Sequence, residues 1–233
     1  AGPRVPQKSL GLRWRRMGAI PLPPKQTVEE HNRTQATFLR EKLEPVLRQA
    51  WAKRRSVFFV DAAHFVQGSF LCCVWCLVRM FVRGASGRRR YNVLGAFNAI
   101  TRELIRVCND TRVSADTMVE LLGRIAAVVT GPTTVVLDNA RYQRCEAVEA
   151  EAKRLGIELL FLPPYSPNLN LIERLWRFTK KKALRGKHYP DFATFRGAID
   201  NCLDRVHTDY REPLASLMTL NFQTFDNTSF MAA

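Results

Sequence analysis

The sequence lacks a hydrophobic run long enough to cross a membrane. Its longest apolar run, from Phe70 to Val78, is too short to span a bilayer and is followed by Arg79. The stretch from Ala1 to Arg16 is basic and has no apolar core of the kind found in signal peptides. We therefore expect a cytoplasmic protein without a membrane partner.

Cysteine is present, but not in a pattern that suits disulfide bonds. Three of the six cysteines lie close together in an apolar stretch, which indicates a reducing compartment. The Cys72-Cys73-x-x-Cys76 run also suggests a zinc site, but no second pair of ligands lies nearby at metal-site spacing. We favour buried thiols on a strand. The six are Cys72, Cys73, Cys76, Cys108, Cys145 and Cys202.

Negative charge is scarce relative to positive charge. The sequence has 36 lysines and arginines against 21 aspartates and glutamates, a formal net charge of +15. An excess of this size predicts nucleic acid as the first partner class and an anionic membrane surface as the second. Hydrophobic residues make up 46% of the chain, which is enough for a buried core and argues against a disordered protein.

The basic residues are densest in two short runs, for which we predict contacts with the DNA backbone. The first run lies in a turn, and the second lies near the end of a helix. A solvated helix end is the alternative for the second run, because lysines there complement the helix dipole. The two runs are Arg88, Arg89, Arg90 and Lys180, Lys181, Lys182.

The first 53 residues divide into an arm and a helix. Residues 1–26 contain five prolines and four arginines, which predicts an extended basic linker or arm. Residues 27–53 predict a helix that leads into the core. Thr27 and Glu30 fit a capping box at its start, and apolar residues recur at helical spacing. Pro45 is expected to kink or restart this helix.

Residues 54–212 have the pattern of a mixed α/β domain, and residues 213–233 follow as a C-terminal tail. Strand candidates come first, and strands then alternate with helices. The predicted strands are Ser56–Val60, Phe70–Val82, Tyr91–Ile100, Leu104–Cys108, Thr133–Leu137 and Ile157–Leu162. The predicted helices are Ala115–Val129, Arg141–Leu155 closed by Gly156, Asn170–Leu184, and one that starts at Asp191.

Two of the predicted strands are followed directly by an aspartate. Ser56–Val60 ends at Asp61, and Thr133–Leu137 ends at Asp138. An Asp at the end of a buried strand lies at the rim of the sheet, where open α/β sheets bind ligands. The alternative for each Asp alone is a cap on the following turn or helix.

A third segment, residues 163–176, feeds a proline-rich loop into a helix. Asn170 is expected to cap that helix, and Glu173 falls in its first turn. A Glu there also has a plain explanation, because it complements the helix dipole or pairs with Arg177. Trp176 and Phe178 are interpreted as packing residues.

Three carboxylates brought together repel one another unless cations lie among them. Oxygen-rich clusters select Mg²⁺ or Mn²⁺ over zinc, and two such ions can activate a hydroxyl and stabilise a leaving oxygen at one phosphate. We therefore predict Asp61, Asp138 and Glu173 as catalytic and metal-binding residues. His64 is interpreted as packed or hydrogen-bonded, because this chemistry needs no histidine base.

The segments that carry these residues resemble the catalytic segments of mariner-type DNA transposases, and most closely the bacterial insertion-sequence branch. They are residues 57–64, 137–140 and 162–173. Thirty-four residues separate Asp138 from Glu173, a spacing typical of that superfamily. The resemblance covers about residues 20–225 and includes residues 90–95.

This resemblance implies a ribonuclease H-like fold, similar to retroviral integrases, with a mixed sheet flanked by helices. It implies that Asp61 and Asp138 share two Mg²⁺ or Mn²⁺ ions and that Glu173 completes the second site. The implied activity is cutting double-stranded DNA at transposon ends and joining the 3′-hydroxyl to target DNA at a TA dinucleotide, without a covalent protein–DNA intermediate. A homodimer on DNA and a nucleoid-associated location in a bacterial cytoplasm are further expectations.

The sequence departs from the family pattern in two places. Many relatives have a histidine at the position of Gln143, so a secondary contact is in doubt. Relatives also carry paired helix-turn-helix modules before the catalytic core, and no such module is expected before Thr27. Two rival interpretations remain: a silent or domesticated transposase that only binds DNA, and another enzyme of the same fold, such as a ribonuclease H or a Holliday-junction resolvase.

Overall fold

The computed structural model describes residues 22–68 and 89–223. The predicted strand Phe70–Val82, the cluster of Cys72, Cys73 and Cys76, and Arg88 lie outside these residues. In the two described ranges, no helix is both long and apolar enough to cross a membrane.

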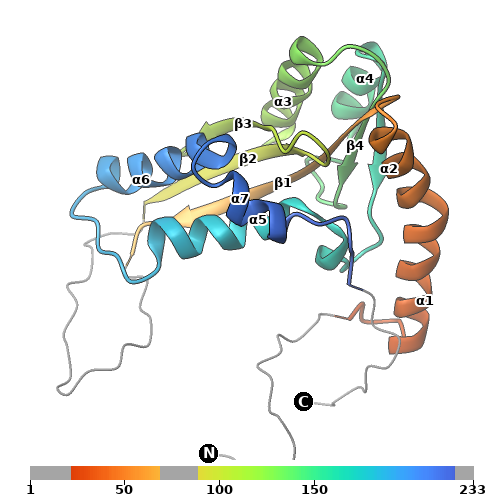
Figure 1. Cartoon of the computed structure of the whole chain (residues 1–233), viewed down its shortest axis with the longest axis horizontal. Helices are drawn as coiled ribbons and strands as arrows, with labels where there is room; N and C mark the ends of the chain where they lie inside the picture. The colour runs from red at the N-terminus through yellow and green to blue at the C-terminus, as the bar shows by residue number, and fades with distance from the viewer. Residues whose placement is uncertain (1–21, 69–88, 224–233) are drawn as a thin grey trace, which may run out of the picture.

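A mixed five-stranded sheet forms the centre of the molecule (Figure 1). Its strand order is β3-β2-β1-β4-β5, with β2 antiparallel to β1 and β3, and β4 parallel to β1 and β5. The predicted ribonuclease H-like α/β arrangement is confirmed. The strands are β1 Ser56–Val66, β2 Arg90–Asn98, β3 Leu104–Asn109, β4 Thr133–Leu137 and β5 Ile157–Phe161.

Helices cover both faces of this sheet (Figure 1). One face packs against α3 and α4, and the other packs against α2, α5 and α6. The bounds are α2 Glu44–Trp51, α3 Ala115–Val128, α4 Glu146–Arg154, α5 Ile172–Thr179 and α6 Phe192–Asp204.

The apolar run at the start of β1 follows from this layering. Phe58 and Val60 belong to the core beneath α3 and α4, whereas Val57 and Phe59 belong to the core beneath α5 and α6. Side chains alternate along a strand, so a strand covered on both faces needs apolar residues at successive positions.

The N-terminal helix begins with the predicted capping box. In α1 (Val28–Phe38), Thr27 Oγ1 accepts from the Glu30 backbone N–H at 3.2 Å, and the Glu30 carboxylate accepts from the Thr27 N–H at 2.8 Å. A π-helical turn, Leu39–Leu43, leads into α2, which carries Pro45 in its first turn. Because proline lacks an N–H and clashes with the preceding turn, the helix restarts here, as predicted.

Two predicted element ends need correction. β1 continues to Val66 rather than ending before Asp61, because β2 pairs with it over its whole second half. The helix expected over Arg141–Leu155 begins only at Glu146, because turns with hydrogen bonds to the Ala140 carbonyl occupy the residues before it.

Other predicted ends are confirmed by their caps. Gly156 has the left-handed φ of 68° that the turn after α4 needs. Asp191 caps α6 by accepting from the Thr194 N–H at 2.7 Å.

The last described residues are held beside α5 by packing and by hydrogen bonds. Leu214 in α7 (Arg211–Leu217) and Met218 are buried in the core. The Arg174 guanidinium donates to the carbonyls of Leu217, Thr219 and Asn221 at 2.7–3.0 Å. This segment therefore packs beside the helix that carries Glu173.

Candidate active site

Asp61 lies within β1, which corrects the prediction that it ends its strand. The parallel pairing of β1 with β4 stops at Phe59↔Val136. Continuing that register by two residues places Asp61 level with Asp138. By alternation from Phe59, Asp61 also lies on the face that α5 covers. Asp61 thus sits beside α5 at the height where β4 leaves the sheet.

Asp138 is the first residue after β4, as predicted. Its Oδ1 accepts from the backbone N–H of Ala140 at 3.0 Å, which turns the chain away from the sheet. The next side chain, Asn139, donates to the Leu162 carbonyl and accepts from Arg144 at 3.3 Å. These bonds tie the ends of β4 and β5 together beneath Asp138.

Glu173 lies in the first turn of α5, as predicted. The Asn170 cap is wrong, because Leu171 occupies the cap position and makes no side-chain cap bond. Asn170 instead points inward and donates from Nδ2 to the Val60 carbonyl at 3.3 Å. The salt bridges of the described residues do not include a pair between Glu173 and Arg177.

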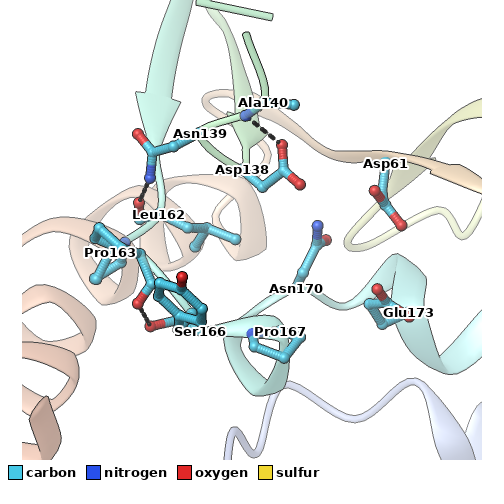
Figure 2. Close-up of a pocket in the computed structure, with 12 residues that line it drawn as sticks. Asp61, Asp138, Asn139, Ala140, Leu162, Pro163, Ser166, Pro167, Asn170 and Glu173 are labelled. Carbon is cyan, nitrogen blue, oxygen red and sulfur yellow. Dashed lines mark hydrogen bonds between the residues drawn. The ribbon is translucent and has the colours of Figure 1, made fainter. Parts of the chain in front are cut away.

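The three predicted carboxylates face one cavity of about 280 Å³ (Figure 2). Asp61 comes from β1, Asp138 from the end of β4 and Glu173 from α5. With these side chains as they stand, no three or more acidic, histidine or cysteine residues in the described ranges are arranged to hold one metal ion. The other lining residues are Asn139, Ala140, Leu162, Pro163, Pro164, Tyr165, Ser166, Pro167 and Asn170.

Burial and like charge raise the proton affinity of this cavity. Burial, followed by the charge of Glu173, raises the pKa of Asp61 to about 7, and the charge of Asp138 adds to the effect. A backbone hydrogen bond from Ala62 and one from Trp176 oppose the rise. Burial also raises the pKa of Asp138. The carboxylates therefore lie in a poorly solvated place where binding of a proton or a cation is favoured.

Trp176 contacts the site, although the sequence indicated only packing. Its indole Nε1–H donates to Asp61 Oδ2 at 3.1 Å. Its buried ring packs edge-to-face against Phe65, with 6.4 Å between the ring centroids. Gly95, the β2 partner of Asp61, leaves space for that ring. The spacing in the sequence could have revealed this contact. Trp176 follows Glu173 by three residues, and residues three apart on a helix are neighbours.

Tyr142 is a second residue that the sequence did not reveal. Burial raises the pKa of its hydroxyl, and the charges of Asp61 and Asp138 add to the rise. Gln143, the position of the family departure, is fully buried and donates to the Tyr142 hydroxyl at 3.3 Å. The charges of Asp61 and Asp138 therefore act on the Tyr142 hydroxyl, which Gln143 contacts from its buried position.

Helix α1 supports the loop that forms one wall of the cavity. The buried Gln35 amide donates to Ser166 Oγ at 3.0 Å and accepts from Asn168 Nδ2 at 2.9 Å. His31 Nε2 lies 2.8 Å from Gln35 Nε2. In the same loop, Tyr165 is held at a left-handed φ of 56°. The N-terminal helix thus fixes the loop that leads to Glu173.

The predicted DNA-contacting residues that the structure describes are all exposed and lie outside the cavity lining. Arg89 forms an ion pair with Asp110 at 3.6 Å and stacks over Phe192. The three lysines occupy the π-helical turn Lys180–Leu184 that continues α5 beyond Glu173. His64 is exposed, and its Nδ1 lies 2.7 Å from Asn92 Oδ1, as expected for a hydrogen-bonded histidine.

A family model for the DDE superfamily endonucleases matches residues 80–196, half of the chain. The chain belongs to the DDE endonuclease superfamily. The matched range includes Asp138 and Glu173 and begins after Asp61. A comparison with curated proteins gave no match.

Solved structures similar to this DDE endonuclease show its fold. The Mos1 strand transfer complex has a TM-score of 0.58 at 12% identity, over 91% of this chain and 68% of that chain. The Mos1 paired-end complex with the left transposon end has a TM-score of 0.59 at 12% identity, over 93% and 69%. The catalytic domain of Mos1 mariner transposase has a TM-score of 0.51 at 12% identity, over 84% of this chain and 98% of that domain.

The cavity of this DDE superfamily member has the donor chemistry that a hard divalent cation needs. Its charged groups are carboxylates, and oxygen ligands suit Mg²⁺ and Mn²⁺. The pKa of Asp61 is raised because its negative charge is buried and is repelled by the neighbouring carboxylates. A bound cation would offset both of these costs. The donor chemistry of the cavity therefore fits the divalent cation that the family implies, while the three carboxylates as they stand are not arranged around one ion.

Asp61→Asn is expected to stabilise the metal-free protein at high pH. The folded-state pKa of Asp61 is raised from 3.8 to about 7, so its contribution to stability is full below pH 4 and is lost as the pH rises through 7. The loss amounts to about 4 kcal/mol. In urea unfolding with EDTA, Asp61→Asn should match the wild type near pH 4 and exceed it at pH 8.

The exposed Asp116 on α3 supplies the control for this experiment. Asp116→Asn should leave the difference between pH 4 and pH 8 unchanged. An Asp61→Asn protein whose stability follows the wild type at both pH values would show that Asp61 carries no raised pKa.

Proposed function

We propose that this chain is the catalytic domain of a DNA transposase of the mariner superfamily, in its bacterial insertion-sequence branch. The carrying observation is that Asp61, Asp138 and Glu173 face one cavity at the edge of a ribonuclease H-like sheet. Membership of the DDE endonuclease superfamily and the three motif segments support it. The proposed reaction is hydrolysis at the transposon ends, followed by transfer of the 3′-hydroxyl into a TA target.

In this proposal the three carboxylates hold two Mg²⁺ or Mn²⁺ ions. Such ions supply the activation of a water or 3′-hydroxyl and the stabilisation of the leaving oxygen. Trp176 orients the Asp61 carboxylate, and the Ala140 N–H orients that of Asp138. The prolines of the 163–167 loop and the Gln35 contacts keep the wall of the cavity in place.

The DNA partner is proposed from charge and from the Mos1 structures. A net charge of +15 favours a polyanion, and the Mos1 structures are a strand transfer complex and paired-end complexes. We propose that the chain acts on two DNA ends as a homodimer, in the nucleoid of a bacterial cytoplasm. The arginine and lysine runs are proposed to contact phosphates of the bound DNA.

A role in DNA binding alone is less well supported. The buried, mutually repelling carboxylates destabilise the metal-free fold, as the raised pKa of Asp61 indicates. A protein that only binds DNA gains nothing from this loss of stability. A cation-dependent enzyme, by contrast, needs the negative charges of the three carboxylates to bind its metal ions.

The test is nicking and strand transfer by the purified chain. The substrates are supercoiled plasmid and duplexes with pre-cut 3′-hydroxyl ends, because these need no recognition of a terminal repeat. We expect nicking and joining with Mg²⁺ or Mn²⁺ and none with EDTA. DNA binding without cleavage of any substrate would contradict the proposal, and cleavage of an RNA–DNA hybrid alone would point to a ribonuclease H.

A further inference from the structure

Asn170 has one polar atom that the described protein leaves without a partner. Its backbone N–H donates to the Pro167 carbonyl at 3.1 Å, and its carbonyl accepts from the Glu173 N–H at 3.3 Å. Its Nδ2 donates to the Val60 carbonyl at 3.3 Å. Among the described residues, nothing donates to its buried Oδ1. Leaving a buried acceptor unsatisfied is unfavourable, so a hydrogen-bond donor or a cation in the cavity would stabilise it.

The orientation of this amide is fixed by β1. β4 pairs with β1 only up to Phe59, so the Val60 carbonyl has no strand neighbour on that side and takes its hydrogen bond from Asn170. The opposite orientation would set Oδ1 of Asn170 against the Val60 oxygen, where two acceptors repel. Oδ1 is therefore the atom available to the cavity.

Asn170 lies among all three carboxylates. Figure 2 shows its side chain rising between Asp138 and Asp61, with Glu173 beside it. The residue is 4% exposed and lines the cavity. A neutral amide oxygen is a hard donor like a carboxylate, yet it adds no charge to a place where repulsion and burial already raise the pKa of Asp61.

We propose that Asn170 Oδ1 is a fourth oxygen ligand of the divalent cation that the carboxylates hold. This inference rests on the proposed function, because it assumes that the cavity binds Mg²⁺ or Mn²⁺. It gives Asn170 two tasks: its amide nitrogen fixes the β1 backbone next to Asp61, and its amide oxygen completes the coordination without further repulsion.

The experiment is calorimetric titration of the whole chain with Mn²⁺ alone, without DNA. Asn170→Leu removes the amide oxygen, and we expect Mn²⁺ affinity to fall about 10- to 100-fold. Asn170→Asp keeps an oxygen ligand but loses the amide N–H that the Val60 carbonyl accepts from, so it should bind Mn²⁺ more tightly than Asn170→Leu. Asn98→Leu is the matched control, since Asn98 is a buried asparagine whose Oδ1 already accepts from the Ile100 and Thr101 N–H groups. It should lose stability but not affinity.

The outcomes separate this inference from the proposed function. Equal Mn²⁺ affinity for Asn170→Leu and wild type, with Asp138→Asn clearly weakened, overturns the role of Asn170 and leaves the metal site standing. Equal affinity for Asp138→Asn and wild type overturns both. Should Asn170→Leu not fold, Asn170→Ser removes the amide oxygen without placing an apolar group in the cavity, and the same expectations apply.

Discussion

Asp138→Asn is expected to lower Mg²⁺-dependent nicking by about 1,000-fold. Asparagine has the same shape and keeps an acceptor for the Ala140 N–H, but it removes the negative charge. Loss of about 4 kcal/mol of transition-state stabilisation at a metal centre corresponds to that factor. The measurement compares initial nicking rates of plasmid DNA, and fluorescence anisotropy with a labelled duplex should show DNA affinity close to that of the wild type.

The charge-matched control is Asp116→Asn, which changes an exposed carboxylate on α3 outside the cavity. It should nick at the wild-type rate. Persistent nicking by Asp138→Asn would show that the cavity is not where the DNA is cut. Equal loss of DNA affinity and of nicking would instead indicate that Asp138 supports binding rather than chemistry.

Local sequence signals predicted the parts of the fold that depend on neighbours in the chain. The capping box at Thr27, the cap at Asp191 and the whole of β4 are as expected, because each depends on side chains a few residues apart. The length of β1 was missed. Its second half is set by pairing with β2, some thirty residues away, and nothing within residues 61–66 reveals that partner.

The same distinction applies to the candidate site. Asp61, Asp138 and Glu173 were found because motifs and strand patterns mark them, and they do line one cavity. Asn170 was assigned to a helix cap because a local rule favours Asn there, yet a carbonyl of β1, far away in the sequence, takes its amide. Tertiary contacts overrode local preference at the point where the loop meets the sheet.

Gly95→Ala is expected to destabilise the protein by about 1–3 kcal/mol through overpacking. A Cβ at Gly95 would lie 2.8 Å from Trp176 Cη2 and 3.1 Å from Ile172 Cδ1. The Trp176 contact is with a rigid, buried ring, so that ring must shift and its N–H must move relative to Asp61. Thermal and urea unfolding measure the loss. Gly123→Ala is the control, because its Cβ meets nothing within 4 Å and should stabilise α3 by about 0.5–1 kcal/mol.

A double-mutant cycle with Trp176→Phe identifies the cause of that loss. Phenylalanine lacks the ring atoms that the new methyl would meet, so the two changes should not add: the double mutant is expected to be more stable than the sum predicts by about 0.5–3 kcal/mol. Strict additivity would mean that Gly95 is needed for its backbone rather than for the indole. Non-additive effects would show that Gly95 and the Trp176 ring depend on each other. Because the same ring donates a hydrogen bond to Asp61, packing above Gly95 would then also help to set the orientation of the Asp61 carboxylate.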